Sequence, residues 1–412
     1  MPAPTPPFAP TLGRRTPRQV SRAVVAVVAS CLVVGSANSP SYGASSAAAE
    51  ATHDYQLPFA CGDRWQGTTR PDHSPTPLSI DWNRDANDLG QPALASAPGT
   101  VLSVRNDADG YGNYVVVDHG SARTTYYAHL SATLVVTGQH VDQGQLVGLV
   151  GSTGRSSGPH LHYEQRRNGA SSHAVFDGVR FQYGSSLASG NCVDLPVVGD
   201  WNGDRRSDVG VFGRRPGTGV YRLRWPDGAV QKRPYGASTE TPLVGDWDGD
   251  GDSDLGRYNP LTRTFALVPG STTTTFRFGL RGDLPISGDW DGDGIFEVGL
   301  YRPGQRMFLL RSQSGTYSTR VLGTVSSLPV AGDWNGDGRY EVGVYDAGAF
   351  TLLRADGTLR RVALGGPGSL PVVGKWGRDA VSDFGTWDGS TGMFTLRFTA
   401  KRVETVRFGR LR

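Results

Sequence analysis

The chain has few cysteines, three in 412 residues, and no long stretch in which hydrophobic residues recur at helical spacing. The missing helical periodicity argues against a helical fold. Glycine and proline are abundant instead, with 57 and 26 residues, and they favour short strands joined by tight turns. We therefore expect a mainly β protein, long enough for two or three domains.

Long hydrophobic runs are also missing. The apolar run at residues 23–34 is too short for a membrane span, so no transmembrane anchor is expected. Small residues follow this run, and four arginines precede it: Arg14, Arg15, Arg18 and Arg22. This pattern predicts a secretory signal peptide at residues 1–44, with cleavage between residues 37 and 51. Lipidation of Cys31 is the alternative.

An excess of one charge is absent once this segment is set aside. Residues 1–44 hold four arginines and no acidic residue, so 37 of the 41 basic residues remain against all 38 acidic ones. A nearly neutral chain offers no broad basic surface to a phosphate backbone, and we expect no nucleic-acid partner.

Only Cys61 and Cys192 remain if Cys31 leaves with the signal. Export places a protein in an oxidising compartment, where an even pair of cysteines favours one disulfide. The disulfide would tie together the two ends of the first domain. Two unpaired buried thiols are the alternative. We expect a secreted, extracellular protein.

The first domain is expected at residues 52–193. It contains four short apolar or β-branched runs bounded by Gly, Asp and Ser, at residues 101–104, 114–117, 124–127 and 146–149. They predict strands of one antiparallel sheet.

The second domain, at residues 194–412, repeats itself. Segments of the type Pro-x-x-Gly-Asp-Trp begin at residues 196, 242, 285 and 329, and a degraded fifth copy begins at 371. A period of 42 to 46 residues with several short strands is typical of a propeller blade. Five copies predict a five-bladed β-propeller, and a solenoid-like stack is the alternative.

The segment His160-Leu161-His162 holds two histidines two residues apart. On a strand, both side chains point to one face, so both imidazoles can reach one metal ion. The surrounding segment from Gly151 to Glu164 closely resembles the signature of lysostaphin/LytM-type zinc endopeptidases, which cleave peptide cross-links of bacterial cell walls. Supporting segments stand in order at residues 97–101, 117–120, 127–130 and 141–145, and the resemblance covers most of residues 70–180.

The resemblance implies one catalytic Zn²⁺ held by His73, Asp81 and His162. Seven residues separate His73 from Asp81, where the usual motif has three, and Asp72 and Asp85 are fallback ligands. Three nitrogen and oxygen ligands leave one position for water, as catalytic zinc sites do. The resemblance also makes His129 and His160 the catalytic pair, without dividing the roles of base and acid between them.

The resemblance further implies a substrate, namely peptidoglycan cross-links or another glycine-rich peptide, and a place at the cell wall. Two other functions stay open. One is an inactive peptidase fold that binds and regulates other wall hydrolases, and the other is a propeller adhesin.

Each of the first four repeats has oxygen-bearing side chains at positions 1, 3, 5 and 9 of a loop. They are Asp200, Asn202, Asp204 and Asp208; Asp246, Asp248, Asp250 and Asp254; Asp289, Asp291, Asp293 and Glu297; and Asp333, Asn335, Asp337 and Glu341. Ca²⁺ takes about six to eight oxygen ligands, and the loops resemble those of integrin-like FG-GAP/VCBS-type propeller repeats. Solvated acidic turns are the alternative.

Three or four structural Ca²⁺ ions are expected. Arg205 replaces the turn glycine at position 6 of the first loop, which makes that site the least secure. The fifth copy has Lys375 at position 1, so it is expected to bind no calcium.

A tryptophan occupies position 2 of every copy: Trp201, Trp247, Trp290, Trp334 and Trp376. Since all five copies keep it, packing between blades is favoured over sugar binding. Fold analogy suggests that the propeller binds a surface polymer or a partner protein.

Overall fold

The computed structural model describes residues 54–84, 88–346, 348–366, 368–377, 379–398 and 402–409. These residues contain 34 strands and one short 3₁₀ helix, η1 (Pro303–Gln305), so the mainly β prediction is confirmed. The predicted signal peptide, Cys31 and Asp85 lie outside the described residues. Within the described part, no helix has the length and apolar character needed to cross a membrane.

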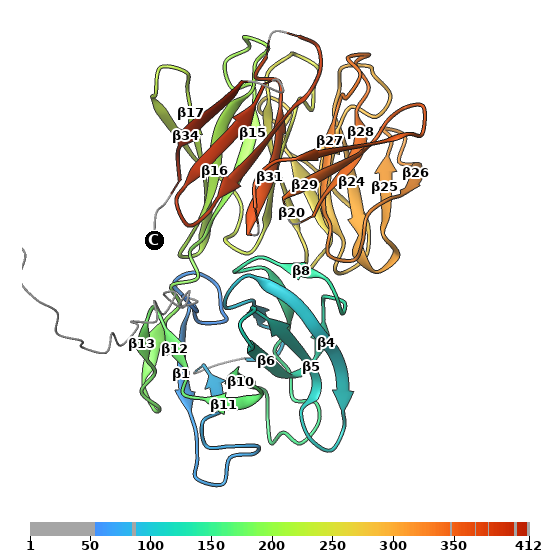
Figure 1. Cartoon of the computed structure of the whole chain (residues 1–412). Helices are drawn as coiled ribbons and strands as arrows, with labels where there is room; N and C mark the ends of the chain where they lie inside the picture. Colours follow the sequence, from blue (N-terminus) through green and yellow to red (C-terminus); the bar gives the residue numbers. More distant parts are fainter. Residues whose placement is uncertain are drawn as a thin grey trace, which may run out of the picture. The chain divides into compact units, whose positions relative to one another are not determined.

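The first region is built on a nine-stranded antiparallel sheet (Figure 1). Its order is β14–β1–β2–β10–β6–β5–β4–β8, and β11 pairs with β10. The bounds are β1 (Arg64–Thr68), β2 (Ile80–Asn83), β4 (Gly99–Asp107), β5 (Gly112–Asp118), β6 (Arg123–Leu130), β8 (His140–Val141), β10 (Leu161–Arg167), β11 (Ala170–Ser172) and β14 (Ser186–Ala188).

Two smaller sheets complete this region. One has the order β3–β9–β7, and the other pairs β12 with β13. Their bounds are β3 (Pro92–Leu94), β7 (Ala132–Thr133), β9 (Leu146–Leu149), β12 (Val175–Phe176) and β13 (Val179–Arg180). The four predicted runs are all strands, but the prediction of one common sheet was wrong. The run at 146–149 is β9, and its hydrophobic pattern identified a strand without identifying its partners.

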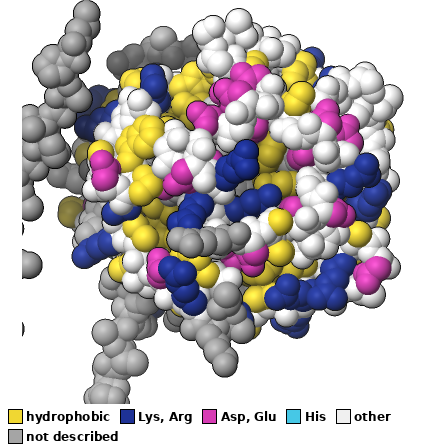
Figure 2. Space-filling model, turned by 90° about the horizontal axis from the view of Figure 1, so that it is seen from above, with side chains coloured by type: hydrophobic (Ala, Val, Ile, Leu, Met, Phe, Trp, Pro, Cys, Tyr) yellow, Lys and Arg dark blue, Asp and Glu magenta, His cyan; other side chains and the backbone are white. Residues whose placement is uncertain are grey.

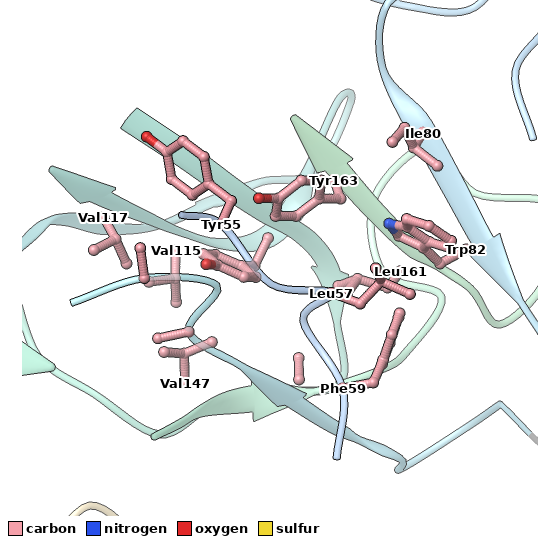
Figure 3. Packing of buried hydrophobic residues seen from close by; sticks show 14 of the residues in the cluster. Tyr55, Leu57, Phe59, Ile80, Trp82, Val115, Val117, Val147, Leu161 and Tyr163 are labelled. Carbon is pink, nitrogen blue, oxygen red and sulfur yellow. The ribbon is translucent and has the colours of Figure 1, made fainter. Parts of the chain in front are cut away.

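One face of the nine-stranded sheet packs against a hydrophobic core. Trp82 of β2, Leu161 and Tyr163 of β10 are fully buried in it, and Figure 3 shows them packed together. Side chains alternate along a strand. Asp81 and His162, next to these core residues, therefore point to the opposite face.

A disulfide joins Cys61 to Cys192, which are 131 residues apart, as predicted. Cys61 lies just before β1 and Cys192 lies after β14, the strand that pairs with β1. The bond therefore ties the beginning of the nine-stranded sheet to the end of the same region.

Residues 194–409 form five four-stranded antiparallel sheets, one for each repeat (Figure 1). In chain order they are β15 (Asp194–Gly199), β16 (Asp208–Arg215), β17 (Thr218–Arg224) and β18 (Val230–Pro234); β19 (Thr241–Gly245), β20 (Asp254–Asn259), β21 (Thr264–Leu267) and β22 (Thr274–Arg277); β23 (Leu284–Gly288), β24 (Glu297–Arg302), β25 (Met307–Arg311) and β26 (Tyr317–Val321); β27 (Leu328–Gly332), β28 (Glu341–Asp346), β29 (Ala349–Leu353) and β30 (Leu359–Ala363); and β31 (Ser369–Gly374), β32 (Asp383–Asp388), β33 (Met393–Arg397) and β34 (Val403–Arg407).

The first strand of each sheet contacts the first strand of the next, and β31 contacts β15. Backbone hydrogen bonds also join neighbouring sheets. The amide of Ser253 donates to the carbonyl of Asp200 over 2.7 Å, and the amide of Ser207 donates to the carbonyl of Lys375 over 2.8 Å. The second of these bonds links the first repeat to the fifth.

Four of the five repeated tryptophans are buried, and Trp290 is partly buried against a hydrophobic cluster. The buried four are Trp201, Trp247, Trp334 and Trp376. The ring of Trp334 stacks on Phe384 of the next sheet, with centroids 5.3 Å apart. A buried ring has no free face for a sugar, so their burial favours packing between sheets.

Charged side chains of both signs are spread over the face drawn in Figure 2, with hydrophobic side chains between them. Such mixing of signs is ordinary for a water-exposed protein surface.

Replacing both Cys61 and Cys192 by serine should lower the free energy of unfolding by about 2–5 kcal/mol, because the disulfide restricts the unfolded chain. Denaturant unfolding measures the change. Reducing agent should destabilise the wild type and leave the double variant unaffected. Two reactive thiols in the unreduced, denatured protein would show that the bond does not form.

Candidate metal centre

Asp81 and His162 are direct cross-strand partners. In the register of β2 and β10, Asp81 lies opposite His162, and Trp82 lies opposite Leu161. Opposed side chains of an antiparallel pair start about 4.5–5.5 Å apart. As a result, His162 Nδ1 lies 3.2 Å from Asp81 Oδ1.

His73 reaches the same carboxylate from the loop between β1 and β2. Its Nε2 lies 3.0 Å from Asp81 Oδ1. Its Nδ1 lies 3.0 Å from the hydroxyl of Thr69, which itself donates to the carbonyl of Pro77 over 2.9 Å. Since the hydroxyl hydrogen is used by Pro77, Thr69 accepts the proton of His73 Nδ1, and Nε2 is left with a lone pair towards Asp81.

His162 is oriented in the same way by a buried carboxylate. Its Nε2 lies 3.0 Å from Glu164 Oε1, which favours a proton on Nε2 and a lone pair on Nδ1. Glu164 is 1% exposed and accepts three further hydrogen bonds, from Tyr111, Arg166 and Ser171. A carboxylate behind a ligand histidine is the usual means of fixing the ring and strengthening the ligand.

His160 lies immediately before β10 and borders the same centre. Its Nε2 is 3.4 Å from Asp81 Oδ1, and its Nδ1 is 2.8 Å from the carbonyl of Gly158. A carbonyl can only accept, so the proton sits on Nδ1 and Nε2 carries the lone pair.

His129 reaches the centre through an irregularity in β6. Ala128 and His129 together lie opposite the single residue Tyr114 of β5, and His129 has a φ of 59°. Such a bulge changes the direction of a side chain, and a non-glycine residue in this conformation is strained. The imidazole centroid lies 4.8 Å from that of His160 and 5.5 Å from that of His162.

The second nitrogen of His129 is also fixed. Nδ1 lies 2.8 Å from the carbonyl of Thr153, so Nε2 carries the lone pair. Burial lowers the pKa of His129 to about 4, and the neighbouring His160 and His162 add to this effect. His129 is therefore neutral at physiological pH and able to accept a proton.

The two carboxylates are ionised despite their burial. Burial alone would raise both pKa values. The imidazoles of His160, His162 and His73, each with a nitrogen within 3.4 Å of Asp81 Oδ1, nevertheless hold the pKa of Asp81 far below its ordinary value. Hydrogen bonds from His162, Arg166 and Tyr111 lower the pKa of Glu164 to about 2.

The donor set fits Zn²⁺. One atom each of His73, Asp81 and His162 lie within 4.8 Å of one another. In a tetrahedral site with bonds of about 2.0–2.1 Å, ligand atoms lie about 3.3 Å apart. The two distances to Asp81 Oδ1, 3.0 and 3.2 Å, are close to this value.

The fallback ligand Asp72 and a further histidine of this region, His119, have other partners. Asp72 is exposed and pairs with Arg70 over 3.4 Å. His119 binds the carbonyl of Pro98 through Nδ1 and the hydroxyl of Thr125 through Nε2, so both of its nitrogens have structural partners.

Sequence reasoning missed two of the supporting residues, Thr69 and Tyr111. Thr69 stands four residues before His73, and this spacing alone does not indicate a contact. Tyr111 is 53 residues from Glu164, so only the pairing of β10, β6 and β5 brings them together.

The acidic loops of the first four repeats share one construction. In the second repeat, Asp246 accepts hydrogen bonds from the amides of Gly249 and Gly251, at 2.7 and 2.9 Å. Asp289, Asp333 and Asp200 accept the equivalent bonds in their loops. At position 6 of the first loop, Arg205 adopts a φ of 65°, on the same side as the glycines of the other loops.

Carboxylates crowd together in these loops. Oxygens of Asp246, Asp248 and Asp250 lie within 4.8 Å of one another, and so do those of Asp289, Asp291 and Glu297. Burial and then the neighbouring carboxylates raise the pKa of Glu297 to about 7 and that of Asp254 to about 6. A cation would relieve this repulsion.

The fifth loop differs. The ammonium of Lys375 lies 3.9 Å from Asp333 Oδ2 of the fourth repeat. Asp383, at position 9, accepts hydrogen bonds from the amides of Trp376 and Gly377. An ammonium therefore stands where the other loops have their first carboxylate.

Residues 80–174 match peptidase family M23, and they form a domain of that family. The chain is 51% identical over 76 residues to the peptidoglycan DD-endopeptidase ShyA of Vibrio cholerae, covering 18% of this chain and 17% of that protein. It is 51% identical over 80 residues to the DD-carboxypeptidase/endopeptidase Mpg of Neisseria meningitidis, covering 19% and 18%.

Among solved structures, a zinc containing peptidase from Vibrio cholerae is 30% identical, with 30% of this chain and 41% of that chain covered and a TM-score of 0.26. The matched segments span less than a fifth of the length of the two curated relatives, ShyA and Mpg. The family match begins after His73, which is joined to the centre by its contact with Asp81.

Replacing Glu164 by glutamine should weaken Zn²⁺ binding about 10- to 100-fold, because the neutral amide no longer holds the His162 ring with a full charge. Competition with a chromophoric chelator measures the affinity. Ser171→Ala, which removes one outer hydrogen bond to the same carboxylate, is the matched control and should have a smaller effect. Unchanged affinity in the glutamine variant would mean that Glu164 does not support His162.

Proposed function

We propose that the chain is a zinc metalloendopeptidase in which His73, Asp81 and His162 hold the metal. The observation that carries this proposal is the Asp81–His162 pair, completed by His73, with the outer nitrogen of each histidine bonded to an acceptor. Such a set presents lone pairs and one negative charge to a common point. A bound Zn²⁺ would acidify a water molecule and polarise a peptide carbonyl there.

His129 and His160 are the proposed catalytic residues. Each has its Nδ1 proton committed to a backbone carbonyl and a lone pair on Nε2. One of the two histidines takes a proton from the attacking water while the oxygen of that water bonds to the carbonyl carbon of the substrate. The resulting imidazolium stabilises the oxyanion or gives a proton to the amine as the carbon–nitrogen bond breaks.

The proposed substrate is the peptide cross-link of bacterial peptidoglycan. The printed names of the matched relatives, a peptidoglycan DD-endopeptidase and a DD-carboxypeptidase/endopeptidase, support this class. Glycine-rich peptides are the second substrate class to test.

We propose that the chain acts outside the cytoplasm, at or near the cell wall. The signal-like segment at residues 1–44 and the Cys61–Cys192 disulfide support this location. The proposed domains are residues 52–193 for the peptidase and 194–412 for the repeats.

We further propose that the five sheets are the blades of a β-propeller that localises the peptidase by binding a surface polymer or a partner protein. The contact between β31 and β15 supports a closed ring. Ca²⁺ in the loops of the first four repeats is proposed to stabilise it, and the crowded carboxylates support this role.

The roles of the two histidines of the His-x-His segment can be separated. His162→Ala should lose both Zn²⁺ and cleavage, whereas His160→Ala should keep Zn²⁺ and lose activity by about 100-fold or more. Metal analysis and mass spectrometry of cell-wall fragments measure the two effects. His140→Ala, outside the centre, is the control. Full activity of His160→Ala would remove His160 from the mechanism, and retained Zn²⁺ in His162→Ala would remove it as a ligand.

Calcium should raise the melting temperature of the full-length protein after dialysis, since a ligand that binds only the folded state stabilises it. Calorimetry with added Ca²⁺, and with Mg²⁺ for comparison, measures the shift. The double variant Asp246→Ala, Asp289→Ala should lose most of the response, whereas Asp379→Ala in the fifth loop should keep it. An unchanged melting temperature in the wild type would contradict the calcium sites.

A further inference from the structure

A row of tyrosines and one arginine continues the metal-bearing face of the nine-stranded sheet. Along β10, His162 is followed on the same face by Glu164 and Arg166, and Tyr126 of β6 lies opposite Glu164. On β5, Val116 lies opposite Tyr126, and Tyr114 stands two residues before Val116 on the same face. The side chains of this row beyond Glu164 are all partly exposed.

The side chains of the row pack against one another, which restricts their motion. The rings of Tyr114 and Tyr126 are nearly parallel, 8° apart with centroids separated by 6.3 Å. Tyr111 lies 5.2 Å from Tyr114 and 5.9 Å from Tyr126. The guanidinium of Arg166 lies over the Tyr126 ring, 4.0 Å from its centroid.

Arg166 is held by hydrogen bonds and is still partly exposed to solvent. It donates to Glu164 over 2.7 Å, to the Tyr111 hydroxyl over 2.7 Å and to the Tyr126 hydroxyl over 3.4 Å. These bonds use three of its five N–H groups. Its side chain is 19% exposed, which leaves donors for a ligand at the surface.

This row does not belong to the hydrophobic core. The core lies on the other face of the same strands, where Tyr127 and Tyr163 are fully buried. The row also adjoins the metal centre directly, since the ring of Tyr111 lies 5.5 Å from that of His162.

We propose that Tyr111, Tyr114, Tyr126 and Arg166 form a substrate subsite for a peptide segment that carries a free carboxylate. The inference rests on the proposed peptidase function. Tyrosine rings offer flat contact area at little entropic cost, and a guanidinium binds a carboxylate with directed hydrogen bonds.

The strand also sets the reach of this subsite. Arg166 is four residues beyond His162, or about 13 Å at about 3.3 Å per residue, and Tyr126 lies half as far along. An extended peptide has a similar spacing per residue. The subsite should therefore contact substrate residues about two to four positions from the cleaved bond.

The test uses two synthetic peptides with the same cleavable bond. One ends next to that bond, and the other extends four residues further on one side and ends in a free carboxylate. A second pair has the extension on the amino-terminal side, where a terminal glutamate side chain supplies the carboxylate. An amidated form of each long peptide completes the set. The enzymes are the wild type, Tyr114→Ala, Tyr126→Ala, and Tyr126→Phe, which keeps the ring.

We expect Tyr114→Ala and Tyr126→Ala to lower kcat/KM on one of the long peptides about tenfold, mainly through KM, and to leave the short peptide and the Zn²⁺ content unchanged. Tyr126→Phe should lose less. Tyr317→Ala, an exposed tyrosine of the repeat region, is the control. In the wild type, amidation should weaken the same long peptide. Equal losses on short and long peptides, or no loss on any, would overturn the subsite.

Direct binding separates this inference from the proposed catalysis. The long peptides are titrated into His160→Ala, with and without Tyr114→Ala, and binding is followed by calorimetry. Weaker binding with Tyr114→Ala supports the subsite even if no peptide is cleaved. Unchanged binding refutes it even if the wild type proves to be an active peptidase.

Discussion

The metal centre depends on the register between β2 and β10. Asp81 faces His162 because Trp82 faces Leu161 on the other side of the same two strands. A slip of one residue would turn the charged side chains into the core and the core side chains out to water. Burial of Trp82, Leu161 and Tyr163 therefore holds the two ligands opposite each other, and the hydrophobic effect fixes a geometry that the polar groups could not maintain alone.

The remaining precision comes from acceptors placed behind each imidazole. Thr69, Glu164 and the carbonyls of Thr153 and Gly158 each bind the nitrogen that faces away from the centre. Four lone pairs and the Asp81 carboxylate are thereby turned towards a small volume. Without a cation, these lone pairs and the carboxylate repel one another. Binding of a metal ion should therefore stabilise this part of the fold.

The sequence was sufficient for those parts that depend on short-range spacing. His160 and His162 were expected side by side. The long His73–Asp81 spacing is accommodated in the loop between β1 and β2, where the hydroxyl of Thr69 bonds both His73 and the carbonyl of Pro77. His129 was expected from the resemblance alone. Strand alternation would have placed it on the core side, next to Tyr127, and only the bulge opposite Tyr114 turns it back. The tyrosine row could not be foreseen either, because strands distant in the sequence must pair before its rings meet.

The residue at position 1 of each of the first four loops makes two kinds of interaction, a backbone hydrogen bond to a neighbouring sheet and side-chain contacts within its own loop, and the fifth repeat keeps only the first kind. In the first repeat, Asp200 accepts a backbone bond from Ser253 with its carbonyl and binds its own loop with its carboxylate. In the fifth repeat, the carbonyl of Lys375 still accepts a backbone hydrogen bond, from Ser207. Its side chain does not bind its own loop, because the ammonium lies near Asp333 of the fourth repeat. The joining of neighbouring sheets is thus a property of the backbone that tolerates a change of side-chain charge. Calcium in the other loops would then serve the loops themselves, by neutralising carboxylates that the repeat pattern crowds together, while the order of the sheets follows from strand contacts and buried tryptophans.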